Sequence, residues 1–298
     1  MTLTHPNFFI VGAAKSGTTS LYHYLRQHPQ VFMPERKEPS FFMDWEGGVR
    51  SSAEYASLFA PARGKAAVGE ASTGYLYAEE AVSRIRGAVP DAKIIMILRN
   101  PVDMCFALWR HMGRIGRRGE RLSFEDALER ESSRMADPAF RAGCVKSWHG
   151  NFYYFHRALY FDQVKRYLDA FGRDCVQIHI FDAFKKDPLG TCRTVFTFLG
   201  VTEDFRPDIT MHNVGAEVRH RGLQKAITNP SPFFERITAT LPSGPSRRLR
   251  AWLKEINIKP PPRMEPGTRR KLREAYAPDV ESLERLIGQD LSFWLKSE

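Results

Sequence analysis

Three short strand-like runs rich in apolar residues constrain the fold of this chain more than any other feature of its sequence. Two are almost continuously apolar, Phe8-Phe-Ile-Val11 and Lys93-Ile-Ile-Met-Ile-Leu98, and the third is Val176-Gln-Ile-His-Ile-Phe181. Apolar stretches of this length are typical of strands that are buried on both faces of a parallel sheet. Helical spacing follows each run, and these helices are expected to include Thr18, Pro101 and Thr191–Leu199. Because strands alternate with helices, we predict an α/β fold in which helices flank a parallel sheet.

Four further helices are expected from apolar spacing and from the positions of helix-ending residues. They are predicted at Ala78–Ala88, Ser123–Ala136, Phe152–Phe171 and a terminal segment from Pro278 to Gly288. Prolines interrupt residues 201–265 repeatedly, and this stretch is predicted to be an irregular, lid-like insertion. We expect the insertion to fold onto the rest of the chain, so that residues 1–298 form a single domain.

The charge balance favours an anionic ligand. Lys and Arg number 44 against 34 Asp and Glu, which gives a formal net charge of +10. Such a surplus suits nucleotides, acidic glycans or nucleic acid and does not choose among them. The four cysteines show neither CxxC pairs nor metal-ligand spacing, which argues against a disulfide framework or a zinc site. No apolar run approaches the roughly 20 residues of a membrane span, and the N-terminus lacks a signal-peptide pattern, so we expect a cytoplasmic protein.

A glycine-containing loop joins the first predicted strand to the first helix. It reads Gly12-Ala-Ala-Lys-Ser-Gly-Thr-Thr-Ser-Leu21. A turn at Gly17 lets the backbone approach a ligand closely, and the N–H groups at the start of a helix attract an anion. Lys15 adds a positive charge, and three hydroxyl side chains add hydrogen-bond donors: Ser16, Thr18 and Thr19. This P-loop-like segment is therefore predicted to bind phosphate.

The loop differs from the GxxxxGK[ST] pattern of ATP-binding proteins. In that pattern the lysine follows the last glycine and the next hydroxyl binds Mg²⁺, whereas here Lys15 precedes Gly17. The second strand ends at Arg99, where an ATPase often has a metal-binding aspartate. We therefore expect no metal, although a P-loop nucleotide kinase remains one alternative function. A non-catalytic polyanion-binding protein is a second alternative, and no zinc-finger or RNP signature supports nucleic acid as the partner.

Several segments, in order along the chain, resemble those of the sulfotransferases that use 3′-phosphoadenosine-5′-phosphosulfate. Lys15-Ser-Gly-Thr-Thr-Ser-Leu21 resembles their 5′-phosphosulfate loop, and Ile97-Leu-Arg-Asn-Pro-Val-Asp103 resembles their 3′-phosphate element. Lys37-Glu-Pro-Ser-Phe-Phe42 is similar to a segment of the carbohydrate branch, which includes the heparan sulfate O- and N-sulfotransferases. Weaker matches are Val68-Gly-Glu-Ala-Ser72, Ala158-Leu-Tyr160 and Gly288-Gln-Asp-Leu-Ser-Phe-Trp294. The chain resembles a soluble, bacterial-type member of this branch.

The resemblance implies that a sulfuryl group moves in line to an acceptor hydroxyl or amine, without a metal. The acceptor would be a small molecule or a glycan, and neither nucleic acid nor a membrane span is expected. Glu38 would be the general base, and Lys15 would neutralise the leaving phosphate. The residues implied to bind the donor lie in the two phosphate elements and in a basic loop of the C-terminal third: Lys15, Ser16, Gly17, Thr18, Thr19, Ser20, Arg99, Arg219, Arg221 and Gly222.

Two positions depart from the family pattern. Ala107 stands eight residues after Arg99, where relatives commonly have a serine that helps to bind the 3′-phosphate. We expect Arg219 and Arg221 to compensate, although a solvated basic turn is the alternative. Ala71 stands where several relatives have a lysine beside the reacting centre.

The general base and the acceptor pocket leave alternatives open. Glu38 could instead form only an ion pair with Lys15 or Lys37. His149 and His156 are the next candidates for the base, whereas His111, about three helical turns after Arg99, is expected to lie too far along the helix. The pocket walls are expected from the loops at roughly 43–65, 110–150 and 203–265, and aromatic side chains could form part of them or belong to the core: Trp109, Trp148, Phe152, Tyr153 and Tyr154.

Overall fold

The computed structural model describes residues 5–115, 119–144, 147–209 and 262–296, together with the backbone of residues 217–218 and 258–259. The contacts divide the chain into two compact units. The first unit joins Met1–His212 with Met264–Glu298, and the second is Asn213–Arg263. Both strand ends that carry the predicted phosphate elements belong to the first unit. A single domain with a lid-like insertion stays a prediction.

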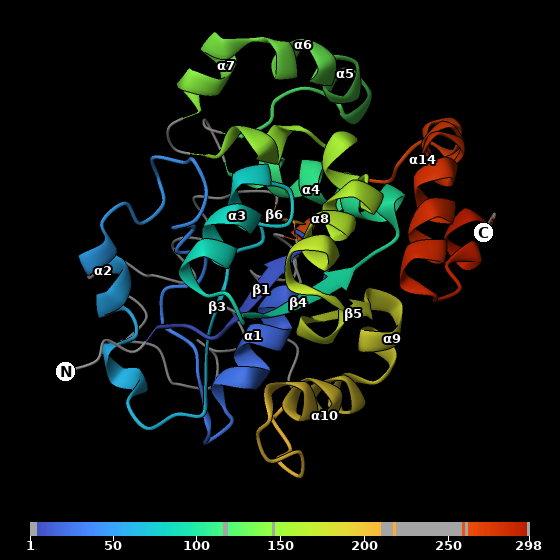
Figure 1. The fold of residues 1–298 in the computed structure, drawn as a ribbon. Helices are drawn as coiled ribbons and strands as arrows, with labels where there is room; N and C mark the ends of the chain where they lie inside the picture. Colours follow the sequence, from blue (N-terminus) through green and yellow to red (C-terminus); the bar gives the residue numbers. More distant parts are fainter. Residues whose placement is uncertain are drawn as a thin grey trace, which may run out of the picture. The chain divides into compact units, whose positions relative to one another are not determined.

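The described part of the first unit contains a five-stranded parallel sheet in the order β2-β3-β1-β4-β5 (Figure 1). Its strands are β1 (Phe8–Gly12), β2 (Val31–Phe32), β3 (Ala67–Ala71), β4 (Lys93–Leu98) and β5 (Val176–Ile180). The three strands predicted from apolar runs are thus confirmed, as is the α/β class with a parallel sheet flanked by helices.

Helices connect the strands and cover the sheet. The α-helices among the described residues are α1 (Thr18–Arg26), α2 (Ser52–Ser57), α3 (Glu79–Ala88), α4 (Pro101–Arg114), α5 (Phe124–Glu129), α6 (Glu131–Ala136), α7 (Pro138–Gly143), α8 (Phe161–Phe171), α9 (Phe181–Lys186), α10 (Pro188–Leu199) and α14 (Pro266–Ile287). Short 3₁₀ helices are η1 (Ala60–Ala62), η3 (His149–Phe152), η4 (His156–Ala158), η5 (Arg173–Cys175) and η6 (Ser292–Leu295). In the second unit, β6 (Glu217–Val218) pairs antiparallel with β7 (Ile258–Lys259).

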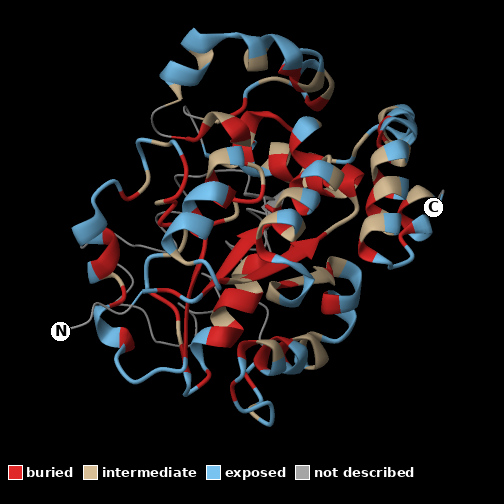
Figure 2. Ribbon diagram, viewed as in Figure 1, coloured by how far each residue is buried: buried red, intermediate tan, exposed pale blue. Residues whose placement is uncertain are grey.

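Successive side chains of β1 enter two different hydrophobic cores, one on each face of the sheet. Phe9 and Val11 belong to the larger core, which also includes buried residues of α3, α4, α8 and α14. Phe8 and Ile10 belong to the smaller core, together with buried residues of α1 and α10. Figure 2 shows the buried sheet between these helices. Burial on both faces explains the uninterrupted apolar runs, since each such side chain contributes about 1.5–3 kcal/mol when it leaves water.

Capping residues set the helix ends at the positions that the sequence indicated. The side chain of Asn100 accepts a hydrogen bond from the amide of Val102 at 3.0 Å, and Pro101 is the first residue of α4. Helices α10 and α14 end at Gly200 and Gly288, whose φ angles of 75° and 69° are left-handed. These predicted boundaries are confirmed.

Two predicted helices differ from those observed. The segment Ser123–Ala136 is divided between α5 and α6, and within residues 152–171 the α-helix begins only with α8. The start of α8 is set by Asp279, whose carboxylate accepts hydrogen bonds from the amides of Tyr160 at 2.7 Å and Phe161 at 3.1 Å. This cap comes from a distant part of the chain, so local spacing could not indicate it.

The C-terminal helix begins earlier than predicted. Helix α14 starts at Pro266, so Pro278 lies inside the helix rather than at its start. A proline at an interior position removes a backbone hydrogen bond and costs about 3 kcal/mol. Helix α14 continues through it because both sides pack into the core, with Tyr276 before the proline and Val280 after it almost fully buried.

Strand β3 lies next to β1 and was not predicted. Its sequence, Ala67-Val-Gly-Glu-Ala71, places a glycine and an ionisable residue in a fully buried strand. Gly69 is required there, because a Cβ atom would lie 2.2 Å from the ring of Phe8. The same strand carries Glu70 into the interior, which has consequences for the site described next.

Candidate active site

The two predicted phosphate elements meet at the carboxyl ends of neighbouring strands. The loop after β1 and Arg99 after β4 share one edge of the sheet, where ligands of open parallel sheets bind. The Nη1 atom of Arg99 donates a hydrogen bond to the carbonyl oxygen of Lys15 at 3.1 Å. Its guanidinium group also lies 5.0 Å from the ring centroid of Phe181. The fold therefore brings together segments that are 84 residues apart in the sequence.

The backbone of the first loop presents donors to an anion. Gly17 has a φ of 87°, and a Cβ atom there would lie 3.0–3.1 Å from the rings of Phe181 and Phe184, so glycine is required. Within the described ranges, no hydrogen bond is found for the amide N–H groups of Lys15, Ser16 and Gly17. These groups precede α1, and the helix dipole adds to their attraction for negative charge.

The hydroxyl groups of this loop differ in their availability. Ser16 is completely buried, and its hydroxyl donates to the carbonyl oxygen of Ala14 at 3.2 Å. Its contribution to an anion site would therefore come from its amide. Thr18 is also buried, whereas Thr19 and Ser20 are half-buried in the first turn of α1.

Positive charges gather around Lys15. Its side chain reaches solvent, yet the pKa of its ammonium group is lowered, first by surrounding protein atoms and then by the charges of Arg114 and Lys37. Arg99 lowers this pKa further, and Glu38 raises it. An anion bound between these cations would relieve their mutual repulsion.

Glu38 lies beside this cluster and its carboxylate is held in place. The backbone amide of Glu38 donates to the carbonyl oxygen of Ala71, at the end of β3, at 2.9 Å. The amide of Thr73 donates to Oε2 at 2.7 Å, and the Thr73 hydroxyl donates to Oε1 at 3.2 Å. Lys37 also contacts Oε1, so the ion pair considered as an alternative role is present. The side chain remains 36% exposed, which leaves the carboxylate accessible.

Arg157 is a site residue that the sequence reasoning missed. It is 3% exposed, donates to the carbonyl oxygen of Thr73 at 3.1 Å and contacts the side-chain oxygen of Asn151. Its guanidinium group lies 5.1 Å from the ring centroid of Trp148. Burial lowers the pKa of Arg157 to about 10, and the charge of Glu38 opposes that shift. The neighbouring match at Ala158-Leu-Tyr160 was the only available signal.

Glu70 is a second residue that the sequence did not single out. It is 0% exposed, and neither carboxylate oxygen has a hydrogen-bond partner among the described residues. Burial raises its pKa to about 8, the charge of Glu38 raises it further, and the nearby hydroxyls of Tyr75 and Tyr55 oppose the shift. This shift favours the neutral form of Glu70, and a neutral carboxyl group adds no negative charge near Glu38.

The three histidines raised as alternatives lie in different surroundings. His111 is in the last turn of α4, and its pKa is lowered to about 4, first by the surrounding protein atoms and then by the charges of Lys15 and Arg114. The Nδ1 atom of His156 is 2.7 Å from the hydroxyl of Tyr77, and Glu38 is not among the groups that shift the pKa of His156 or His149.

The remaining predicted residues are only partly placed. Ala107 is half-buried on α4, and Ala71 ends β3. Arg219, Arg221 and Gly222 lie outside the described residues. The part of the chain with described side chains contains no cluster of His, Cys, Asp or Glu that could hold a metal ion. No described helix is both long enough and apolar enough to span a bilayer.

Comparison with known proteins gives a consistent result. A family model described as "Sulfotransferase domain" matches residues 5–236. Heparan sulfate glucosamine 3-O-sulfotransferase 6 of Homo sapiens is 25% identical over 298 residues, which cover 97% of this chain and 73% of that protein. Bifunctional heparan sulfate N-deacetylase/N-sulfotransferase 4 of Mus musculus is 26% identical over 310 residues, 98% of this chain and 31% of that protein.

A solved structure extends the match to the fold. The crystal structure of a sulfotransferase from Alicyclobacillus acidocaldarius has a TM-score of 0.73 and 35% sequence identity. The match covers 98% of this chain and 100% of that one. The chain spans only 21% and 31% of the lengths of the first two curated relatives that it matches.

Proposed function

Because the chain belongs to the sulfotransferase domain family, we propose that this sulfotransferase takes 3′-phosphoadenosine-5′-phosphosulfate as donor and a hydroxyl or amine as acceptor. The observation that carries the proposal is the hydrogen bond from Arg99 to the carbonyl oxygen of Lys15. This hydrogen bond joins the two segments that we propose bind phosphate, and a donor with phosphates at both its 3′ and 5′ positions needs two such sites close together.

The two elements have separate roles in donor binding. The unbonded amides of the first loop and the Lys15 ammonium group suit the 5′-phosphosulfate. Arg99 can form a bidentate pair with the 3′-phosphate. Ala107 supplies no hydroxyl to this second site, and the compensating role of Arg219 and Arg221 remains part of the proposal.

The donor supplies an activated sulfuryl group. As the acceptor oxygen or nitrogen forms its bond to sulfur, the sulfur–oxygen bond to the 5′-phosphate breaks and negative charge develops on that phosphate. Lys15 and the loop amides stabilise this charge, and they do so more strongly in the transition state than in the ground state. Positioning and charge stabilisation dominate, as in phosphoryl transfer.

Glu38 accepts the proton that leaves the acceptor. The two hydrogen bonds from Thr73 orient its carboxylate, and Arg157 holds Thr73 through the carbonyl oxygen on the other side. The raised pKa of Glu70 favours its neutral form, which limits the negative charge near Glu38. The contact with Lys37 is compatible with this role, since the side chain stays accessible.

The donor assignment is tested by calorimetric titration of 3′-phosphoadenosine-5′-phosphate against ADP, both without metal, and of ATP with Mg²⁺. A charge-assisted pair with the 3′-phosphate contributes about 1.5–3 kcal/mol, so a preference of at least tenfold over ADP is expected. Arg99→Ala should abolish that preference, and the exposed Arg63→Ala serves as control. Equal affinity for the two adenosine phosphates would refute the assignment, and selective binding of ATP–Mg²⁺ would favour a nucleotide kinase.

A further inference from the structure

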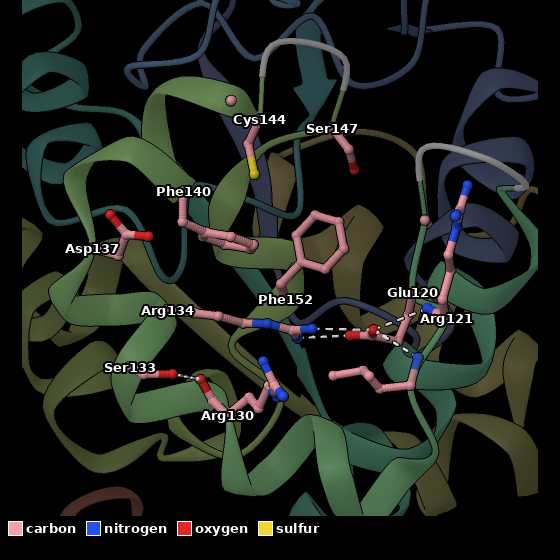
Figure 3. Close-up of a pocket in the computed structure, with 13 residues that line it drawn as sticks. Glu120, Arg121, Arg130, Ser133, Arg134, Asp137, Phe140, Cys144, Ser147 and Phe152 are labelled. Carbon is pink, nitrogen blue, oxygen red and sulfur yellow. Dashed lines mark hydrogen bonds and ion pairs between the residues drawn. The ribbon is translucent and has the colours of Figure 1, made fainter.

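A large pocket opens outside the cluster around Lys15 and Glu38. It has a volume of about 930 Å³ and is lined by residues that follow α4, by the segment that contains α5–α7 and by η3 (Figure 3). Pockets of this size hold small organic ligands. It lies within one of the loop regions, residues 110–150, from which the sequence predicted acceptor contacts.

A buried ion pair forms one wall of the pocket. Glu120 is 3% exposed in its side chain, and its oxygens lie 2.6 and 3.1 Å from the guanidinium nitrogens of Arg134. Glu120 also accepts hydrogen bonds from the amide of Arg121 at 2.9 Å and the hydroxyl of Tyr154 at 2.9 Å. The charges of the pair neutralise each other, and the Glu120 oxygens already accept several hydrogen bonds, so the pair shapes the wall rather than attracting an anion.

Apolar groups supply much of the remaining wall. The guanidinium group of Arg134 lies 5.5 Å from the ring centroid of Phe140 and 5.7 Å from that of Phe152. Leu122 and Cys144 also line the cavity. Of the two serines that line the pocket, Ser133 already donates to the carbonyl oxygen of Arg130, which leaves the hydroxyl of Ser147. These walls suit a flat apolar group better than a polyhydroxylated ring.

Two further arginines give the pocket its charge. Arg121 and Arg130 are exposed, line the cavity and form no ion pair within the described ranges (Figure 3). The other lining carboxylate, Asp137, is occupied at the start of α7, where it accepts from the amide of Ala139 at 2.8 Å. Two guanidinium groups without an ion pair, at a pocket that also has aromatic walls, are suited to a carboxylate or sulfate.

A chain of contacts links the pocket to the proposed general base. Phe152 lines the pocket, and its neighbour Asn151 accepts from Arg157. Arg157 in turn donates to the carbonyl oxygen of Thr73, whose amide and hydroxyl donate to Glu38. An acceptor that lies in this pocket therefore occupies a cavity supported by the same segment that orients Glu38.

The wall that contains Glu120 is hydrogen-bonded to α4. The amide of Glu120 donates to the carbonyl oxygen of Met112 at 3.2 Å, in the last turn of the helix that begins after Arg99. The Glu120 wall is thus continuous with the helix that follows Arg99, as the Phe152 wall is with the segment that holds Thr73.

We propose that this pocket is an acceptor subsite for a molecule with an apolar, aryl-like body and an anionic end, a carboxylate or a sulfate, which Arg121 and Arg130 bind. The proposal rests on the proposed function, because it names the acceptor class of the same site. In this arrangement the anionic end of the acceptor lies in the pocket, and the hydroxyl that receives the sulfuryl group faces Glu38.

The test compares three probes that differ in charge and in the nature of the ring. They are 4′-hydroxybiphenyl-4-carboxylate, its uncharged carboxamide and a glucuronic acid–N-acetylglucosamine disaccharide. Binding is measured by calorimetry without donor, so that the result does not depend on turnover. The wild-type protein should bind the carboxylate about tenfold more tightly than the carboxamide, and more tightly than the disaccharide.

Variants locate that preference. The double variant Arg121→Ala, Arg130→Ala should bind the carboxylate and the carboxamide with equal affinity. The conservative double variant Arg121→Lys, Arg130→Lys should retain most of the preference for the carboxylate. Arg193→Ala is the matched control, because Arg193 is exposed on α10, which packs on the other face of the sheet. An unchanged preference in the alanine double variant, or tighter binding of the disaccharide, would overturn the proposal.

Cysteine alkylation gives a second measurement on the unmodified chain. Cys144 lines the pocket and Cys175 precedes β5, and both are half-buried. The biphenyl carboxylate probe should slow alkylation of Cys144 by N-ethylmaleimide and leave the alkylation of Cys175 unaffected. No protection of Cys144 at a saturating probe concentration would overturn the proposed subsite.

A final measurement separates the pocket proposal from the proposed donor. The affinity for 3′-phosphoadenosine-5′-phosphate is measured on the wild-type protein and on the same variants. If the wild-type protein binds 3′-phosphoadenosine-5′-phosphate but shows no preference for the carboxylate probe, the pocket proposal alone fails. If neither the wild-type protein nor any variant binds 3′-phosphoadenosine-5′-phosphate, the proposed donor is contradicted instead.

Discussion

Replacing Glu70 with glutamine should remove a strong pH dependence from the stability of this protein. Glu70 is completely buried, and its pKa is raised from 4.5 to about 8. Between these two values the folded protein keeps the proton on Glu70 while the unfolded chain has lost it. Unfolding therefore releases a proton, and the free energy of unfolding falls as the pH rises through this window.

The size of the effect follows from the width of the window. It spans about 3.5 pH units, and each unit is equivalent to about 1.4 kcal/mol, so the contribution of Glu70 falls by up to about 5 kcal/mol between pH 4.5 and 8. Entry of water around the ionised carboxylate would reduce this value. Even half of it is a substantial part of the 5–15 kcal/mol typical of folded domains.

Urea unfolding of the wild-type protein and Glu70→Gln from pH 5 to 8.5 measures this effect. The variant keeps the shape and cannot ionise, so the difference between the two free energies of unfolding isolates the titration of Glu70. That difference should shift in favour of the variant as the pH rises. Glu35→Gln is the control, because the Glu35 side chain is 96% exposed. A difference that stays constant with pH would refute the buried, neutral carboxyl group.

Three further predictions concern the reaction. Glu38→Gln should reduce sulfuryl transfer by about 10²–10⁴-fold with little change in donor affinity, measured on the same preparation beside Glu35→Gln; near-normal transfer would move the base to another group. Lys15→Ala should lower turnover far more than ground-state donor binding, and pre-steady-state kinetics that show the reverse would make Lys15 only an anchor. Ala107→Ser should tighten binding of 3′-phosphoadenosine-5′-phosphate by about 1 kcal/mol in calorimetry, and unchanged binding would mean that other donors already satisfy the 3′-phosphate.

Elements whose signals are local were predictable from the sequence. The strands β1 and β4 follow from apolar side chains that are buried on both faces, and β5 follows from its β-branched residues. Asn100 and Gly200 mark helix ends through their own conformations and hydrogen bonds. The loop around Gly17 was predictable for the same reason, because its left-handed backbone requires glycine regardless of the rest of the fold.

Elements that depend on distant partners were not predictable. Strand β3 contains a glycine that is explained only by the Phe8 ring against it, and α8 begins where the carboxylate of Asp279 caps it. Helix α14 runs through Pro278 because core packing outweighs the lost hydrogen bond. The burial of Glu70 and Arg157 belongs to the same group, since exposure is a property of the packed molecule.

The sequence alone therefore determined the parallel α/β fold and located the two motifs predicted to bind phosphate, because strand periodicity, caps and the glycine loop act over a few residues. Only the tertiary structure decided how the chemistry is arranged. Parallel pairing of β1 with β4 places Arg99 on the carbonyl oxygen of Lys15, and the end of β3 brings Thr73 to Glu38. Such contacts depend on strand order and burial, which arise when distant segments exclude water together.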